Sequence, residues 1–187
     1  MILNRKDELV IDVAKQLEIK YNVARSTIKK CSYDDENDVY LCESEDVAYD
    51  FDKIKEKYCE HMKYKDMSSM DALIEIDSKK MIYLVEFKNK AKLPYKDLRA
   101  KIHDSLFIIE NEFGIIRDMF SVLELIVVYN PDKNKRKKLK GIRDHFKALA
   151  GEKYDEIEHF KMFKDRYDIS SYKFSAEDFL EYLKLSS

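Results

Sequence analysis

Two short runs in which apolar and polar residues alternate, Met70–Asp77 and Met81–Lys88, constrain the fold of this chain most strongly. A period of two residues is typical of β-strands, and the polar residues Asp77–Lys80 between the runs are typical of a turn, so together they predict a β-hairpin. A turn at Ser78-Lys79, or a four-residue turn over Asp77–Lys80, pairs Asp71 with Glu86 and puts their Cβ atoms about 5 Å apart. A three-residue turn would shift this pairing.

The alternation also decides which side chains share a face of this hairpin. Successive side chains of a strand point to opposite faces, so Glu86 and Lys88 lie on the same face as Asp71. The other face is wholly apolar and is formed by Ala72, Ile74, Ile76, Met81, Tyr83, Val85 and Phe87. Two carboxylates and one ammonium group are therefore expected on one side of the hairpin.

Facing carboxylates repel each other, so Asp71 and Glu86 need a compensating cation, either a bound metal ion or the ammonium of Lys88. Mg²⁺ or Mn²⁺ takes oxygen ligands, and Mg²⁺ commonly binds one or two carboxylates together with water and substrate phosphate. Lys88, about 7 Å further along the same face, can hold an attacking water or neutralise charge that develops on a phosphate. Phosphodiester hydrolysis needs these groups.

The segments around the hairpin predict a mixed β-sheet flanked by helices, an α/β fold. Apolar residues at helical spacing predict amphipathic helices over 6–21, 46–65 and 94–113, the last with Pro94 in its first turn. The apolar segment Val122–Tyr129 predicts a buried central strand, which ends at Asn130-Pro131.

The remaining segments have weaker patterns, from which the following secondary structure is predicted. The acidic stretch Ser32–Glu45 predicts a solvated loop with a short edge strand over Val39–Cys42. A basic helical stretch over Lys133–Leu149 follows the central strand. Near the end of the chain, Ile169–Phe174 alternates weakly, and Ser175 is typical of an N-cap for a last helix through Leu183.

Composition bounds the size and class of the protein. The 187 residues, of which 45% are hydrophobic, suit one domain over residues 1–187, and a net charge of −2 gives no overall basic excess. Three glycines and two prolines leave no place for a phosphate-binding loop or a G-x-G-x-x-G motif, and neither H-E-x-x-H nor G-x-S-x-G occurs. Three cysteines without a C-x-x-C pair fit a reducing compartment. No apolar run approaches the ~20 residues of a membrane span, so we expect a soluble cytoplasmic protein without membrane contact.

The segments Ser69-Met-Asp71 and Glu86-Phe-Lys88, with fourteen residues between Asp71 and Glu86, resemble the signature of the PD-(D/E)XK nuclease superfamily. Met70 stands where that signature has proline. Helix 94–113 and strand 122–129 are similar to the later elements of the superfamily core, which is ordered αβββαβ and has the restriction endonuclease-like fold. The resemblance covers about residues 46–130. It extends to a group of small, poorly characterised bacterial proteins of this fold.

The resemblance implies a metal-binding hydrolase. Asp71, Glu86 and the backbone carbonyl of Phe87 would bind Mg²⁺ or Mn²⁺, and Lys88 would be the catalytic lysine. A further acid on the first core helix is often present, for which Asp50 on helix 46–65 is the better candidate and Glu8 the alternative. If helix 6–21 is instead the first core helix, strand 39–42 becomes the first core strand and helix 46–65 an insertion.

Other residues are candidates for contacts to nucleic acid. Lys101 flanks the apolar stripe of helix 94–113 and can contact phosphate, or it can form a surface charge pair with Asp104. The run 133–143 holds seven cations in eleven positions and is either a phosphate-binding patch, with Lys137, Lys138 and Arg143 as contacts, or a solvated helix face. A cluster of aromatic residues at core-like spacing is more typical of a core or a dimer interface than of base stacking: Tyr154, Phe160, Phe163, Tyr167, Tyr172 and Phe174.

We therefore expect a divalent-metal-dependent nuclease, with DNA favoured over RNA as substrate. The alternative is a catalytically silent nuclease-like module that binds a protein partner in an immunity or assembly role. The cationic run 133–143 favours the enzyme. The acidic segment 34–46 favours the alternative, because it would repel nucleic acid and attract a basic protein.

Overall fold

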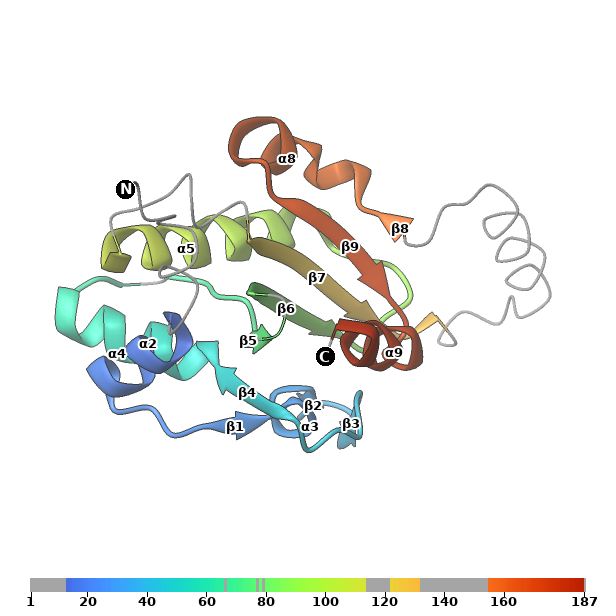
Figure 1. Ribbon diagram of the computed structural model, residues 1–187, viewed down its shortest axis with the longest axis horizontal. Coiled ribbons are helices and arrows are strands. Elements are labelled where there is room, and N and C mark those ends of the chain that lie inside the picture. Colours follow the sequence, from blue (N-terminus) through green and yellow to red (C-terminus); the bar gives the residue numbers. More distant parts are fainter. Residues whose placement is uncertain are drawn as a thin grey trace.

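A mixed sheet of seven strands organises the chain. The computed structural model describes residues 13–65, 67–76, 78, 80–113, 122–131 and 155–186, and Figure 1 shows the strands side by side with helices on both faces. The strands lie in this order: β1 (Ser26–Thr27), β4 (Val47–Asp50), β5 (Ala72–Ile76), β6 (Met81–Lys88), β7 (Leu123–Tyr129), β9 (Ser170–Phe174) and β8 (Asp155–Glu156). The expected α/β fold with a mixed, helix-flanked sheet is confirmed.

The centre of the sheet combines an antiparallel meander with parallel strands. Strands β4, β5 and β6 pair antiparallel in sequence order, whereas β7 is parallel to β6 and β9 is parallel to β7. Helix α5 (Tyr95–Phe113) makes the connection between β6 and β7 that parallel strands require. A separate two-stranded sheet consists of β2 (Tyr33–Asp34) and β3 (Val39–Tyr40).

The β5–β6 hairpin has the register that the sequence predicts. Ala72 pairs with Val85, and the ladder continues to Ile76, which pairs with Met81. Asp71 lies one residue before β5, and its N–H donates to the carbonyl of Val85 at 3.0 Å. The alternation of faces is also confirmed, because alternate residues of the hairpin belong to two separate cores.

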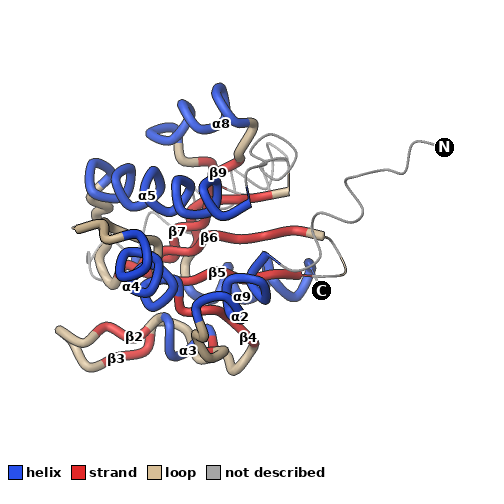
Figure 2. The backbone as a smooth tube through the Cα atoms, turned by 90° about the vertical axis from the view of Figure 1, so that its left-hand side faces the viewer, coloured by secondary structure: helices blue, strands red, loops and turns tan. Residues whose placement is uncertain are grey.

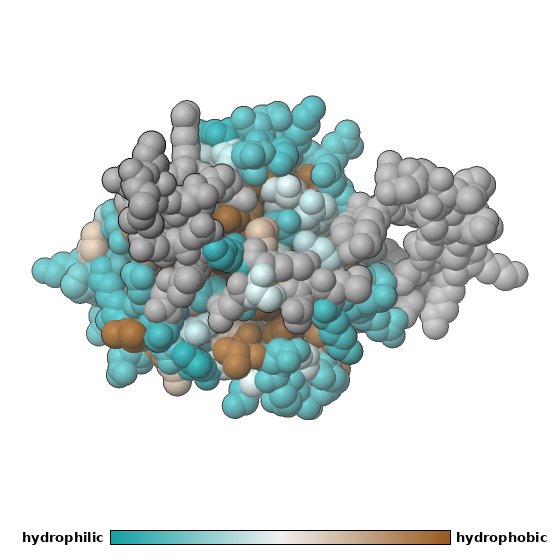
Figure 3. Space-filling view, in the orientation of Figure 1, coloured by the Kyte–Doolittle hydropathy of each residue, from teal (hydrophilic) through white to brown (hydrophobic). Residues whose placement is uncertain are grey.

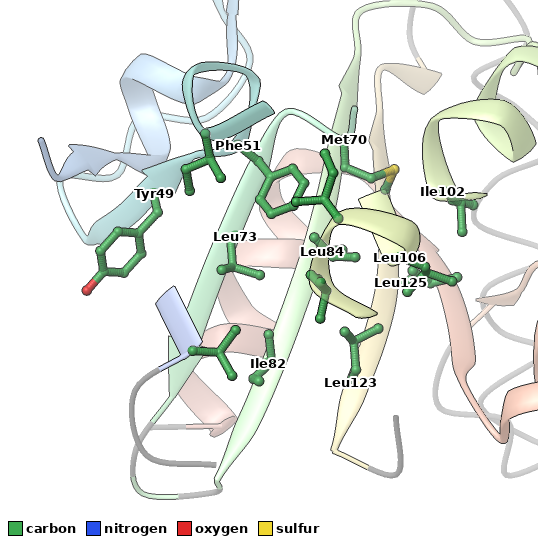
Figure 4. Close-up of a cluster of buried hydrophobic side chains, with 14 of the residues drawn as sticks. Tyr49, Phe51, Met70, Leu73, Ile82, Leu84, Ile102, Leu106, Leu123 and Leu125 are labelled. Carbon is green, nitrogen blue, oxygen red and sulfur yellow. The ribbon is translucent and has the colours of Figure 1, made fainter. Parts of the chain in front are cut away.

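One core lies between the sheet and four helices, α2 (Val13–Tyr21), α4 (Phe51–Met62), α5 and α8 (Lys161–Tyr167), with the 3₁₀ turn η2 (Glu158–Phe160). Figure 4 shows Leu73, Ile82 and Leu84 of the hairpin beside side chains of α5 and β7 in this core. The other core lies against α3 (Ile28–Cys31) and α9 (Ala176–Ser186). Figure 2 shows α5 running alongside the sheet.

The expected helix over 46–65 is partly wrong. Residues Val47–Asp50 form strand β4, whose Tyr49 pairs with Leu73, and α4 begins only at Phe51. Asp50 is the N-cap of α4: its Oδ1 accepts a hydrogen bond from the N–H of Lys53 at 3.1 Å. Val47 and Phe51 fit a helical stripe by spacing alone, and pairing with β5 overrides that pattern.

The expected edge strand over 39–42 is also corrected. Strand β3 covers only Val39–Tyr40 and pairs with β2, outside the large sheet. Strand 39–42 is therefore not the first core strand, because β4 is the strand that lies beside β5. Of the expected helix 6–21, the described part is α2; Glu8 and the basic stretch 133–149 lie outside the described residues.

Four other expected elements are confirmed: the helix after Pro94 (α5), the central strand (β7), the last strand (β9) and the helix that follows it (α9). Ser175 caps α9 as predicted, accepting the N–H of Asp178 at 3.2 Å. The short elements β1, α3, β8, η2 and α8 have no strong pattern and were not expected. No helix in the described part of the chain is long and apolar enough to cross a membrane. The described surface is mostly hydrophilic in the view of Figure 3.

Candidate functional site

Four charged side chains meet where β6 ends, and three of them are the predicted Asp71, Glu86 and Lys88. The fourth is Lys101 of α5, whose Nζ lies 3.1 Å from Asp71 Oδ1 and 2.7 Å from Glu86 Oε1. The Nζ of Lys88 lies 2.5 Å from the same oxygen of Glu86. The site therefore contains two carboxylates and two ammonium groups.

Backbone contacts fix the position of Asp71. Its Oδ2 accepts a hydrogen bond from the N–H of Phe87 at 2.7 Å, and its carbonyl accepts one from the N–H of Phe51 at 3.1 Å. The first contact joins Asp71 to β6 and the second joins it to the start of α4. The carboxylate is thus oriented before any ligand arrives.

The segment that leads into Asp71 is held by the two neighbouring helices. On α5, Asp104 accepts the N–H of Ser68 at 2.7 Å and Ser105 accepts the N–H of Met70 at 2.9 Å. On α4, Asp52 accepts the hydroxyl of Ser69 at 2.5 Å. Asp104 therefore does not form the surface pair with Lys101 that was one expectation; it anchors the backbone next to the site.

Lys101 bridges the carboxylates of Asp71 and Glu86, a contact that sequence reasoning missed. Burial alone would lower the pKa of Lys101, but the charges of Asp71 and Glu86, and the hydrogen bonds to them, outweigh burial and raise it. The signal in the sequence was that Lys101, Asp104 and Ser105 share one side of helix 94–113. Which strand that side faces follows only from the packing of α5 on the sheet.

Glu86 is fully buried and carries one oxygen without a partner. Its Oε2 accepts no hydrogen bond from the described part of the chain, whereas Oε1 contacts Lys88 and Lys101. Burial, followed by the charge of Asp71, raises the pKa of Glu86 to about 7, although both lysines act to lower it. A buried carboxylate oxygen without a partner is costly, which makes it a good position for a cation or a water.

These residues fit a divalent metal ion with few protein ligands. Among the residues described here, no three His, Cys, Asp or Glu side chains form a group that could hold a metal. Mg²⁺ needs no such group, because it commonly takes one or two carboxylates and keeps several waters. The N–H of Phe87 points to Asp71, and a residue's carbonyl lies on the same side of a strand as its N–H, so the Phe87 carbonyl also lies on that side.

In the structure Asp50 is a helix cap, whereas the sequence makes it a candidate for an additional metal ligand. Its Oδ1 caps α4, and its Oδ2 lies 2.9 Å from the Nζ of Lys53. The sequence predicts Asp50 within a helix, but it is the last residue of β4. Its role as an additional metal ligand stays a prediction, and the alternative, Glu8, lies outside the described residues.

The other nucleic-acid candidates are placed only in part. Lys137, Lys138 and Arg143, with the whole run 133–143, lie outside the described residues. Of the aromatic cluster, Phe160, Phe163 and Phe174 are buried in the two cores, as expected for packing residues rather than for base-stacking residues.

Comparison of the chain with protein-family models, with curated proteins and with solved structures found no match.

Proposed function

We propose that this chain is a Mg²⁺- or Mn²⁺-dependent phosphodiesterase that cleaves DNA, built on a PD-(D/E)XK nuclease-like core. The observation that carries the proposal is the group Asp71, Glu86 and Lys88 at one end of β6, with a buried oxygen of Glu86 that has no partner in the described chain. The order of elements supports it: three antiparallel strands, β4 to β6, are followed by α5 and a strand parallel to β6.

In this proposal Asp71, Glu86 and the carbonyl of Phe87 would hold the metal ion. When bound, the ion polarises a phosphate oxygen and lowers the pKa of a coordinated water. The protein fixes the ligands in advance, because the N–H of Phe87 orients Asp71 and the strand places Glu86. Burial around Glu86 strengthens electrostatic interactions inside the site.

The two lysines have different roles in the proposal. Lys88 lies at the last position of β6 and is partly exposed, so its ammonium can reach a phosphate outside the protein and stabilise the negative charge that develops there. Lys101 contacts both carboxyl groups and compensates part of their negative charge. A divalent ion would compete with Lys101 for these oxygens, and the ammonium released from them could then contact phosphate.

A second candidate function is a catalytically silent module that binds a protein partner. One observation favours it: two ammonium groups already lie against the two carboxyl groups and compensate their negative charge without a metal ion. Such a balanced cluster can be purely structural.

The test is cleavage of single- and double-stranded DNA and RNA with Mg²⁺ or Mn²⁺ by wild type and by Lys88→Ala. Loss of a preorganised cation at developing charge should slow cleavage by about 10²–10³-fold. Lys90→Ala is the matched control, since Lys90 is an exposed lysine two residues further on. Equal rates for wild type and Lys88→Ala would remove Lys88 from the mechanism. If wild type cleaves none of these substrates, the silent module replaces the enzyme.

A further inference from the structure

A pocket of about 490 Å³ opens next to the candidate site, where β6, β7 and β9 end. Its walls come from the β2–β3 hairpin and from the first residues of α9, which lie near these strand ends in Figure 1. The polar and aromatic lining consists of three asparagines, two tyrosines, one serine and one acid: Asn37, Asn89, Asn130, Tyr40, Tyr129, Ser175 and Glu177. The volume is within the usual range of small-molecule sites.

The amide groups at the base of the pocket are held in fixed orientations. Asn89 is only 8% exposed; its Oδ1 accepts a hydrogen bond from Asn130 Nδ2 at 2.9 Å and its Nδ2 donates to Asp34 Oδ2 at 2.8 Å. These two bonds use one amide hydrogen and one lone pair, and an asparagine side chain has a second of each. Asn89 can therefore both donate to and accept from a molecule in the pocket.

The charge of the pocket selects against phosphate. None of the described residues that line it is a lysine or arginine, and Glu177 is its one acid. The neighbouring hairpin adds further negative charge through Asp34, Asp35, Glu36 and Asp38. A neutral, planar group with hydrogen-bond donors and acceptors suits amides and tyrosine rings far better than an anion does.

The pocket lies at the same end of the sheet as the candidate catalytic lysine. Tyr129, which lines the pocket, is the register partner of Lys88 across the β6–β7 ladder, and adjacent strands lie about 4.8 Å apart. Asn89 follows Lys88 in the chain. A polynucleotide that places a phosphate at Lys88 would pass this end of the sheet, and we expect one of its neighbouring bases beside Tyr129 and Asn89.

We infer that this pocket receives one unpaired nucleobase of the substrate, so that the protein acts on single-stranded or locally unpaired nucleic acid. The inference rests on the proposed function, because the phosphate at Lys88 places the base. Tyr129 and the exposed part of the Tyr40 ring, which also contacts Tyr33 and the ammonium of Lys29, supply aromatic surface for stacking. Asn89 supplies hydrogen bonds to the base edge. A base inside a duplex cannot enter such a pocket without leaving the stack.

The experiment uses short single-stranded DNA and RNA oligonucleotides with 2-aminopurine at successive positions, titrated with metal-free protein. The chain contains no tryptophan, so its own fluorescence interferes little. We expect one position at which the 2-aminopurine signal changes most on binding. We also expect Tyr40→Ala to weaken binding about 5- to 150-fold, the factor that corresponds to 1–3 kcal/mol of base stacking. Tyr40 is 44% exposed and belongs to neither core, so its loss should leave both cores intact.

Tyr64→Ala is the matched control, because Tyr64 is similarly exposed and does not line the pocket. An abasic nucleotide at the responding position should weaken binding to wild type as much as Tyr40→Ala does, without any change in the protein. Equal affinities of wild type and Tyr40→Ala, or equal affinities for intact and abasic strands, would overturn the inference even if the protein cleaves DNA. Base-dependent binding without cleavage would uphold the pocket and overturn the proposed catalysis, and no binding by wild type would overturn both.

Discussion

Among the described residues, only one charged side chain is fully shielded from solvent, that of Glu86. Burial disfavours its charged form, and Asp71 adds repulsion, so the lysines compensate only in part. Such an arrangement costs stability, and costs of this kind are typical of functional sites. Among single residues, Glu86 is therefore the one whose burial in the fold most directly supports the proposed metal site.

The pKa of Glu86 predicts a pH-dependent stability. A carboxyl whose pKa is about 7 in the folded chain and near the ordinary 4.5 in the unfolded chain binds more protons when folded, so its contribution to stability falls as pH rises from 4.5 to 7. Glu86→Gln removes this loss. In urea denaturation with EDTA, we expect the variant to gain on the order of 3 kcal/mol in unfolding free energy relative to wild type between pH 4.5 and 8.

Glu60→Gln is the control for this pH series. Glu60 is exposed, and its hydrogen bond to Lys57 lowers its pKa, so this variant should show no relative gain as pH rises. A constant difference between wild type and Glu86→Gln across the pH range would mean that Glu86 stays ionised in the fold.

Substitution of Asp71 and substitution of Lys101, which contact each other at the site, should change the affinity for metal in opposite directions. Asp71→Asn removes a negative ligand and should abolish the heat of Mn²⁺ binding in calorimetry. Lys101→Met removes the ammonium that lies between the carboxylates, and we expect it to tighten Mn²⁺ binding by about ten-fold. If all three proteins give the same isotherm, no ion binds between Asp71 and Glu86.

At the scale of elements, the site depends on how α4 and α5 hold residues 68–70. Asp104 and Ser105 bind two backbone N–H groups of this segment, and Asp52 binds the hydroxyl of Ser69. Asp71 follows directly, so the helices set the position of a carboxylate that belongs to neither of them. The same face of α5 supplies Lys101.

Ser105→Ala tests this anchoring role. The variant leaves the buried N–H of Met70 without its acceptor, which should lower the unfolding free energy by about 1–3 kcal/mol. We also expect weaker Mn²⁺ binding, because the backbone before Asp71 is then no longer held in place by α5. Ser32→Ala is the matched control: Ser32 is also buried and accepts a backbone N–H, that of Cys42, away from the site. It should lose similar stability and keep the metal affinity of wild type.

At the scale of the whole molecule, charge is distributed unevenly along the chain. The net charge is −2, yet acids concentrate in segment 34–46 and cations in the run 133–143. The β2–β3 hairpin carries much of the acidic segment beside the proposed base pocket. A polynucleotide must therefore be attracted by cations elsewhere, for which the run 133–143 is the sequence-based candidate.

The salt dependence of DNA binding tests this assignment. If Lys137 and Lys138 contact phosphates, replacing both with Gln should reduce the slope of log K against log[salt] by about 0.7–0.9 for each lost contact. Fluorescence anisotropy at several salt concentrations measures the slope. The control pair is Lys57→Gln with Lys65→Gln, two exposed lysines outside the run. A slope equal to that of wild type would assign the run to a solvated helix face.

The features that the sequence determined by itself are those with a short period. The β5–β6 register, the faces of Asp71, Glu86 and Lys88, helix α5 and strand β7 follow from periods of 2 and 3.6 residues and from turn and capping residues. These patterns depend on neighbours within a few positions, so they can be read without the fold.

The features that only the tertiary structure decided depend on contacts between distant segments. Residues Val47–Asp50 have a helical pattern yet form a strand, because β5 offers them a pairing partner more than twenty residues away. Lys101 reaches Asp71 and Glu86, and Ser105 reaches Met70, because α5 packs on the sheet at one particular angle and rotation. The pocket likewise needs the β2–β3 hairpin, the ends of three strands and the start of α9 in one place. Local periodicity carries no information about such long-range contacts, because they depend on which surfaces the folded chain buries against each other.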